Sequence, residues 1–154
     1  MKRVIILTVL IVVLGAVFAM AMAARNAPAC LFYDLGDNPM QLAFYKGKPI
    51  VLFFWATWCP YCRQAMGSLN SRYPELMQYD IKVIGVNIQE PRDMVIKFVN
   101  SKRIKFEIWR DKDGSCANSF GIVGIPTHVL INKNGKIVAK TNSLPEDYKE
   151  LLFR

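Results

Sequence analysis

Two cysteines stand where a buried strand is expected to give way to a helix. The stretch from Ile50 to Trp55 is a continuous run of β-branched and aromatic side chains, which is typical of a central strand buried on both faces. It is followed by the segment WCPYC, Trp58 to Cys62, and from there to about Met77 apolar residues recur at spacings of three and four. The sequence therefore predicts a strand, a short loop that carries both cysteines, and an amphipathic helix.

This placement of the two cysteines suits thiol–disulfide exchange. Cys59 is expected at the N-terminus of the helix, where unpaired backbone N–H groups and the helix dipole favour the thiolate. Cys62 is expected one turn further along, close enough to attack a mixed disulfide formed at Cys59. The pair therefore makes a complete candidate exchange unit.

Other roles for a closely spaced cysteine pair fit less well. A zinc site needs a second pair of Cys or His ligands, but the only histidine is His128, and Cys30 and Cys116 are far apart in the sequence. A c-type haem needs a histidine directly after the second cysteine, where Arg63 stands. A purely structural disulfide remains open, although a bond across two residues closes a small loop that stabilises little.

The rest of the chain alternates between predicted strands and helices, and so indicates a mixed α/β sandwich. A second apolar strand over residues 82–87 would complete a βαβ crossover with the first. The further expected elements are a helix from Pro91 through Val99, a short strand at 107–109, a short helix at 115–120, a hairpin formed by 127–131 and 136–140, and a final helix from about Pro145 to Phe153 with Ser143 as its N-cap.

Size and charge limit the class of protein. A chain of 154 residues with 53% hydrophobic residues has room for one domain with one core and is too apolar to be disordered. The net charge is +8, of which Lys2 and Arg3 are the only charged residues among the first 24, so +6 remains on the rest. Because these charges are scattered without an arginine-rich arm, no nucleic-acid partner is expected.

The N-terminal segment has the order of an export signal. Lys2 and Arg3 precede an apolar run of about twenty residues that ends at Ala24, and a small-x-small site at residues 21–23 could be cleaved. The run is also long enough to span a bilayer as an apolar helix, with everything after Arg25 outside the cytoplasm by the positive-inside rule. We therefore expect a signal peptide or membrane anchor at residues 1–24, a linker and irregular N-terminal extension at 25–40, and an extracytoplasmic domain at 41–154.

Two separated motifs resemble those of the thioredoxin superfamily. The segment Phe54 to Cys62 is similar to its active-site loop, and Gly124 to Thr127 is similar to its cis-proline loop. The export segment and the turn at 111–114 further resemble the extracytoplasmic TlpA/ResA/DsbE-type branch. The resemblance covers about residues 31–153 and implies a thioredoxin-like three-layer α/β sandwich, with a mixed central sheet flanked by helices.

The resemblance also implies roles for individual residues. Cys59 would be the nucleophile and Cys62 the resolving thiol, with neither a cofactor nor a metal. Pro126 would be cis and face the pair, and Ile125 would offer backbone groups to an extended substrate segment. The remaining substrate-facing residues would be Trp58, Pro60 and Tyr61.

The implied activity is reduction of disulfides in exported proteins such as apocytochrome c. Electrons would come from a membrane thiol donor, and the protein would act as a monomer. Two alternatives stay open: an oxidase that introduces disulfides, and a module that binds copper or thiols without turnover.

The sequence departs from its family at the proton-relay positions. Thioredoxin has an aspartate where this chain has Phe53, and the ResA-like pattern has a glutamate where this chain has Ala65. The proton of Cys62 must therefore travel by another group, by water or by a partner.

The two remaining cysteines are harder to interpret. In an exported protein Cys30 and Cys116 could form a structural disulfide that ties the N-terminal extension to the domain. They could equally remain free thiols, with Cys116 as a small helix residue.

Overall fold

The computed structural model describes residues 25–154. The expected export segment at residues 1–24 lies outside this range. Within the described range, no helix combines the length and the apolar character needed to cross a bilayer.

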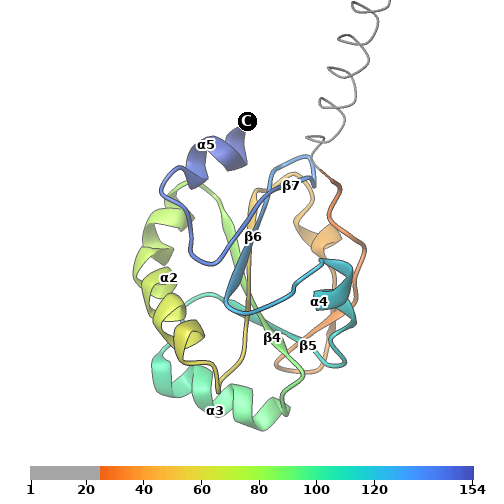
Figure 1. Cartoon of the computed structure of the whole chain (residues 1–154), viewed down its shortest axis with the longest axis vertical. Coiled ribbons are helices and arrows are strands. Elements are labelled where there is room, and N and C mark those ends of the chain that lie inside the picture. Colours follow the sequence, from red (N-terminus) through yellow and green to blue (C-terminus); the bar gives the residue numbers. More distant parts are fainter. Residues whose placement is uncertain (1–24) are drawn as a thin grey trace, which may run out of the picture.

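The described chain folds around one seven-stranded sheet with strand order β2-β1-β5-β4-β3-β6-β7 (Figure 1). Strands β3, β4 and β5 are parallel to one another, and the outer pairings are antiparallel. The elements in chain order are β1 (Phe32–Asp34), β2 (Pro39–Met40), the 3-10 helix η1 (Leu42–Tyr45), β3 (Ile50–Trp55), α2 (Pro60–Gln78), β4 (Lys82–Ile88), α3 (Arg92–Lys102), β5 (Glu107–Asp111), α4 (Ser115–Ser119), β6 (Thr127–Ile131), β7 (Ile137–Thr141) and α5 (Tyr148–Phe153).

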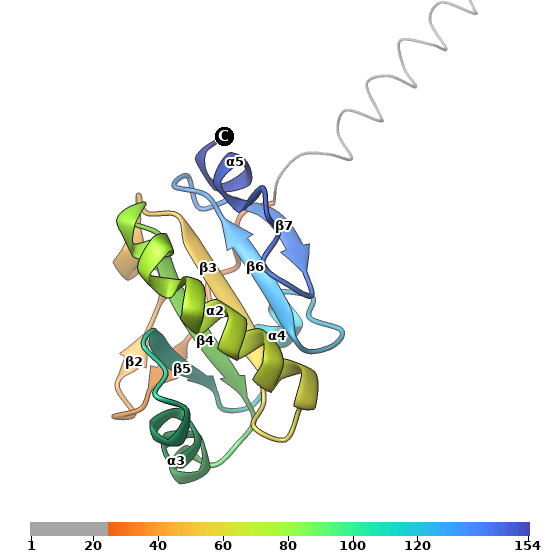
Figure 2. The same ribbon diagram turned by 90° about the vertical axis from the view of Figure 1, so that its left-hand side faces the viewer.

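Helices cover both faces of the sheet, so the predicted three-layer sandwich is confirmed (Figure 2). The first face carries α2, α3 and α5, whose apolar side chains pack against Val51, Phe53 and Trp55. The second face carries α4, which packs against Leu52 and Phe54. Because alternate side chains of β3 point to opposite faces, all six of its residues are buried, as the continuous apolar run predicts.

The βαβ crossover is also confirmed. Strand β3 pairs in parallel with β4, from Ile50 opposite Lys82 to Trp55 opposite Asn87, and α2 connects them. The carboxyl ends of the parallel strands therefore meet at the edge of the sheet where α2 begins.

The prediction of irregular chain over residues 25–40 is wrong in part, because β1 and β2 add two strands to the sheet. Phe32 is fully buried, with its ring 5.3 Å from that of Trp109. The carboxylate of Asp34 accepts hydrogen bonds from the backbone N–H groups of Gly36 and Asn38, at 2.7 and 2.8 Å, and so closes the turn between the two strands. Strands of two and three residues are too short to show the alternating pattern by which a strand is predicted from sequence.

The last helix begins later than predicted. Residue Asp147, not Ser143, precedes its first turn, and the helix runs from Tyr148. The hydroxyl of Thr141 donates a hydrogen bond to the carbonyl oxygen of Ser143 at 2.7 Å, which helps to hold this stretch as a turn after β7.

Candidate active site

The two cysteines lie at the junction between β3 and α2. Cys59 is the N-cap of α2, and Pro60 occupies the first helical position, where a missing N–H costs no hydrogen bond. The backbone N–H of Cys62 donates to the sulfur of Cys59 at 3.1 Å. The local sequence thus places the first sulfur at the positive end of a 19-residue helix.

The pair is joined by a disulfide with a Cα–Cα distance of 5.2 Å. Cys62 is completely buried, and Cys59 retains 4% of its surface. The residues beside them are far more open, because Trp58 and Tyr61 are 68% and 74% exposed. The disulfide is therefore buried, while the aromatic side chains on either side of Cys59 and Pro60 in the sequence are exposed to solvent.

The second motif reaches the same place from far away in the sequence. The Ile125–Pro126 peptide bond is cis, and the sulfur of Cys59 lies 3.9 Å from the carbonyl oxygen of Ile125. Pro126 is buried and Ile125 half-buried, whereas Val123, two residues earlier, is fully exposed. The structure thus brings together the two segments that the sequence singles out.

A carboxylate holds the loop in front of Cys59, and sequence reasoning missed it. Glu90 accepts hydrogen bonds from the backbone N–H of Thr57 at 2.7 Å and from its hydroxyl at 2.5 Å. The same carboxylate accepts from the side-chain amide of Asn87 at 2.6 Å. The signal that could have found it is its position just past the end of β4, because that end adjoins the end of β3.

The surroundings of Cys62 are apolar at the two positions where related proteins carry a relay carboxylate. Phe53 belongs to the same buried cluster as Cys62, and Ala65 packs against that cluster. His128 lies opposite Phe53 on β6, with the two rings 4.8 Å apart. Burial lowers the pKa of His128 to about 4, so the imidazole is neutral at physiological pH.

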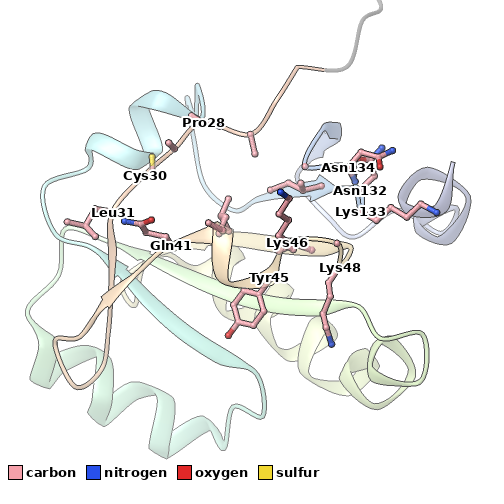
Figure 3. A pocket seen from close by; sticks show the side chains of 18 residues that line it. Pro28, Cys30, Leu31, Gln41, Tyr45, Lys46, Lys48, Asn132, Lys133 and Asn134 are labelled. Carbon is pink, nitrogen blue, oxygen red and sulfur yellow. Dashed lines mark hydrogen bonds between the residues drawn. The ribbon is translucent and has the colours of Figure 1, made fainter.

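Residues 25–154 contain no group of three His, Cys, Asp or Glu side chains placed to hold a metal ion. A pocket of about 830 Å³ lies at the other end of β3 from the cysteines (Figure 3). Segments around Cys30, Tyr45 and Asn132 line it, together with Ile50 at the start of β3. It is therefore separate from the cysteine site.

Comparison with known proteins agrees with this arrangement. The model of the AhpC/TSA family matches residues 23–140, which is more than half of the chain. The thiol-disulfide oxidoreductase ResA of Halalkalibacterium halodurans is 32% identical over 163 aligned positions, which cover 97% of this chain and 93% of that protein. The ResA protein of Bacillus thuringiensis is 32% identical over 128 positions, covering 83% of this chain and 73% of that protein.

Solved structures have the same fold. The thioredoxin domain of a thiol-disulfide oxidoreductase from Bacteroides vulgatus superimposes with a TM-score of 0.74 at 26% identity, covering 84% of this chain and 97% of that one. StoA from Bacillus subtilis superimposes with a TM-score of 0.66 at 24% identity, covering 81% and 94%. With its cysteine pair at the start of α2, this chain belongs to the AhpC/TSA family and is a thioredoxin-fold protein thiol-disulfide oxidoreductase of the ResA/DsbE-like type.

Proposed function

We propose that this protein reduces disulfides of exported proteins, with Cys59 as nucleophile and Cys62 as resolving thiol. The observation that carries the proposal is the position of the Cys59 sulfur. It lies at the N-terminus of α2, 3.9 Å from the Ile125 carbonyl oxygen, in a loop whose Trp58 and Tyr61 side chains are exposed.

The reaction starts from the reduced pair. The thiolate of Cys59 attacks one sulfur of the substrate disulfide, so that a mixed disulfide forms and the second substrate sulfur leaves as a thiolate. Cys62 then attacks the sulfur of Cys59, which releases the first substrate sulfur and leaves the Cys59–Cys62 disulfide. Two electrons pass from the pair to the substrate.

The proton of Cys62 goes to the departing substrate in this scheme. Cys62 is completely buried in an apolar cluster, and Phe53 and Ala65 occupy the positions of the family's relay carboxylates. The substrate thiolate that leaves in the first step needs a proton and belongs to the same substrate that is still bound to Cys59 when Cys62 attacks. The substrate itself is thus the nearest acceptor.

Substrate recognition uses the surface around the sulfur. We assign the exposed side chains of Trp58 and Tyr61, together with Pro60, to contacts with the substrate surface. The backbone of Ile125, next to Pro126, would pair with an extended substrate segment. Such backbone contacts suit partners that are not yet folded, and apocytochrome c is the client we propose.

The proposed cellular location is based on the N-terminal sequence. We propose that the segment ending at Ala24 exports the domain, so that residues 41–154 and the extension before them act outside the cytoplasm. A membrane thiol donor would return the Cys59–Cys62 disulfide to the dithiol, and the protein would act as a monomer. If residues 1–24 are retained, they also anchor it to the membrane.

Trapping variants test the assigned roles. Full-length Cys62→Ser should accumulate a mixed disulfide with a protein substrate such as insulin, because the resolving attack is lost. Cys59→Ser should lose exchange altogether, and Cys30→Ser serves as a matched control that keeps the wild-type rate. A Cys59→Ser protein that still reduces insulin at the wild-type rate would contradict the assignment.

A further inference from the structure

The two cysteines outside the active site lie close to each other in the structure, at the wall of one pocket. Cys116 is buried on α4, and its thiol donates a hydrogen bond to the carbonyl oxygen of Leu31 at 3.5 Å. Cys30, the residue before Leu31, is half-buried, and both cysteines line one pocket of about 430 Å³. Their side chains also pack into the same apolar cluster on the α4 face of the sheet.

The ionisation of Cys116 reflects its burial and its closeness to Cys30. Burial is the main cause that raises the pKa of the Cys116 thiol, and the next causes are a hydrogen bond and charge interaction with Cys30. Neither cysteine is disulfide-bonded in the structure. The cysteines are 86 positions apart in the sequence, so it is the fold that brings both to the wall of the same pocket.

We propose that Cys30 and Cys116 form a second, reversible disulfide that fastens the N-terminal segment 25–31 to α4. This site is distinct from the Cys59–Cys62 pair. It lies on the opposite face of the sheet from α2, and Cys30 also forms part of the wall of the large pocket (Figure 3). Two free thiols at one pocket, in a domain that we propose to be exported, are the combination that favours such a bond.

The oxidant is a disulfide, either of another protein or of glutathione. The more exposed Cys30 thiolate attacks it and forms a mixed disulfide, and one oxidant sulfur leaves as a thiolate. Cys116 then attacks the sulfur of Cys30 and releases the second oxidant sulfur. Two S–H bonds are lost and one S–S bond forms, while the oxidant gains two electrons and two protons.

The bond would secure the point where the chain enters the domain. Segment 25–31 is already held at its start, where Ala27 donates a backbone hydrogen bond to Gly135 at 2.8 Å and Arg25 accepts one from Ile137 at 2.8 Å. The disulfide would hold its other end, next to β1. Oxidation should therefore stabilise the N-terminal edge of the sheet.

Thiol mapping tests the proposal in the full chain. In the Cys59→Ser/Cys62→Ser variant, incubation with excess oxidised glutathione should remove both remaining thiols together, as measured by alkylation after denaturation. Peptide mapping without reductant should show one linked peptide pair that contains Cys30 and Cys116. Two separately glutathionylated cysteines, or two thiols that stay free, would overturn the proposal.

A matched variant tests whether the disulfide depends on the position of residue 30 or forms with any exposed cysteine in the N-terminal segment. Adding Asn26→Cys to Cys30→Ser in the same background moves the thiol by four residues, to an exposed position outside the pocket that Cys116 lines, and should not give the linked peptide pair. A linked pair at wild-type yield in this variant would contradict the proposed site.

The stability of the same Cys59→Ser/Cys62→Ser chain gives a second readout, because Cys30 and Cys116 are then the only pair that changes redox state. The oxidised chain should unfold at a midpoint roughly 5–15 °C above that of the chain reduced at this pair. Equal midpoints would overturn the fastening role. Insulin reduction by Cys30→Ser should equal that of the wild type, so a failure here is distinct from a failure of the proposed function.

Discussion

Cys59 and Cys62 are one helical turn apart but differ in what surrounds them. The sulfur of Cys59 is next to the Ile125 carbonyl and the exposed Trp58, whereas Cys62 is completely buried among apolar side chains. This difference suits a first thiol that meets the substrate and a second that reacts only within the protein. The sequence alone could predict the pair, because a strand–loop–helix pattern with this spacing is local.

The role of Glu90 could not be read from local pattern, because its partners lie on a different loop. Glu90→Gln would keep the size of the side chain but place an amide N–H₂ group among the donors of Thr57 and Asn87. We expect the free energy of unfolding to fall by about 1–3 kcal/mol and insulin reduction to slow. Urea unfolding and an insulin assay measure both.

The control for this variant is Glu146→Gln, whose side chain is 94% exposed. It should leave both quantities unchanged. If Glu90→Gln behaves like this control, the carboxylate does not hold the active-site loop.

His128 should make stability depend on pH. An unfolded histidine binds a proton near pH 6.5, but burial lowers the pKa of His128 to about 4, so unfolding takes up a proton between these values. Its contribution is therefore fully present above pH 6.5 and is lost as the pH falls toward 4. Between pH 7 and pH 4.5 we expect a loss of about 2–3 kcal/mol.

Urea unfolding of the wild type and of His128→Gln at these two pH values isolates this contribution, because all other groups are shared. The variant should lose less stability than the wild type. An equal loss in both proteins would rule out His128 as the cause.

At the scale of elements, long periodic segments could be predicted and short ones could not. The six buried residues of β3 and the 19 residues of α2 carry their patterns in the sequence. Strands β1 and β2 have three and two residues, and their place in the sheet depends on the contact of Phe32 with Trp109. Contacts between distant residues leave no local pattern, and for the same reason the sequence alone could not show that Cys30 and Cys116 line one pocket.

The N-terminal extension should therefore contribute to stability as part of the sheet. Phe32→Ala removes a fully buried ring and should lower the free energy of unfolding by about 3–5 kcal/mol. Phe44→Ala is a matched control in which the ring is 63% exposed, and it should change the free energy by less than about 0.5 kcal/mol. Chemical unfolding compares the two, and equal effects would mean that the extension is only a linker.

At the scale of the whole molecule, the active site and the entry of the chain lie at opposite ends of the sheet (Figure 1). The chain enters beside the start of β7, where Asn26 pairs with Lys136. The start of β7 lies at the same end of the sheet as the start of β3, because Ile137 and Ile50 both pair with Ile131. The cysteines follow Trp55 at the other end of β3. An anchor attached at residue 24 would thus leave the Cys59 side turned away from the point of attachment.

The direction of electron flow is the central claim, and the reduction potential of the Cys59–Cys62 pair tests it most directly. The measurement uses the Cys30→Ser/Cys116→Ser chain equilibrated with glutathione or dithiothreitol buffers, so that only one pair titrates. A reductase should have a potential near that of thioredoxin, about −270 mV or lower. A potential near that of a strong oxidant, about −120 mV, would contradict the reductase and support an oxidase.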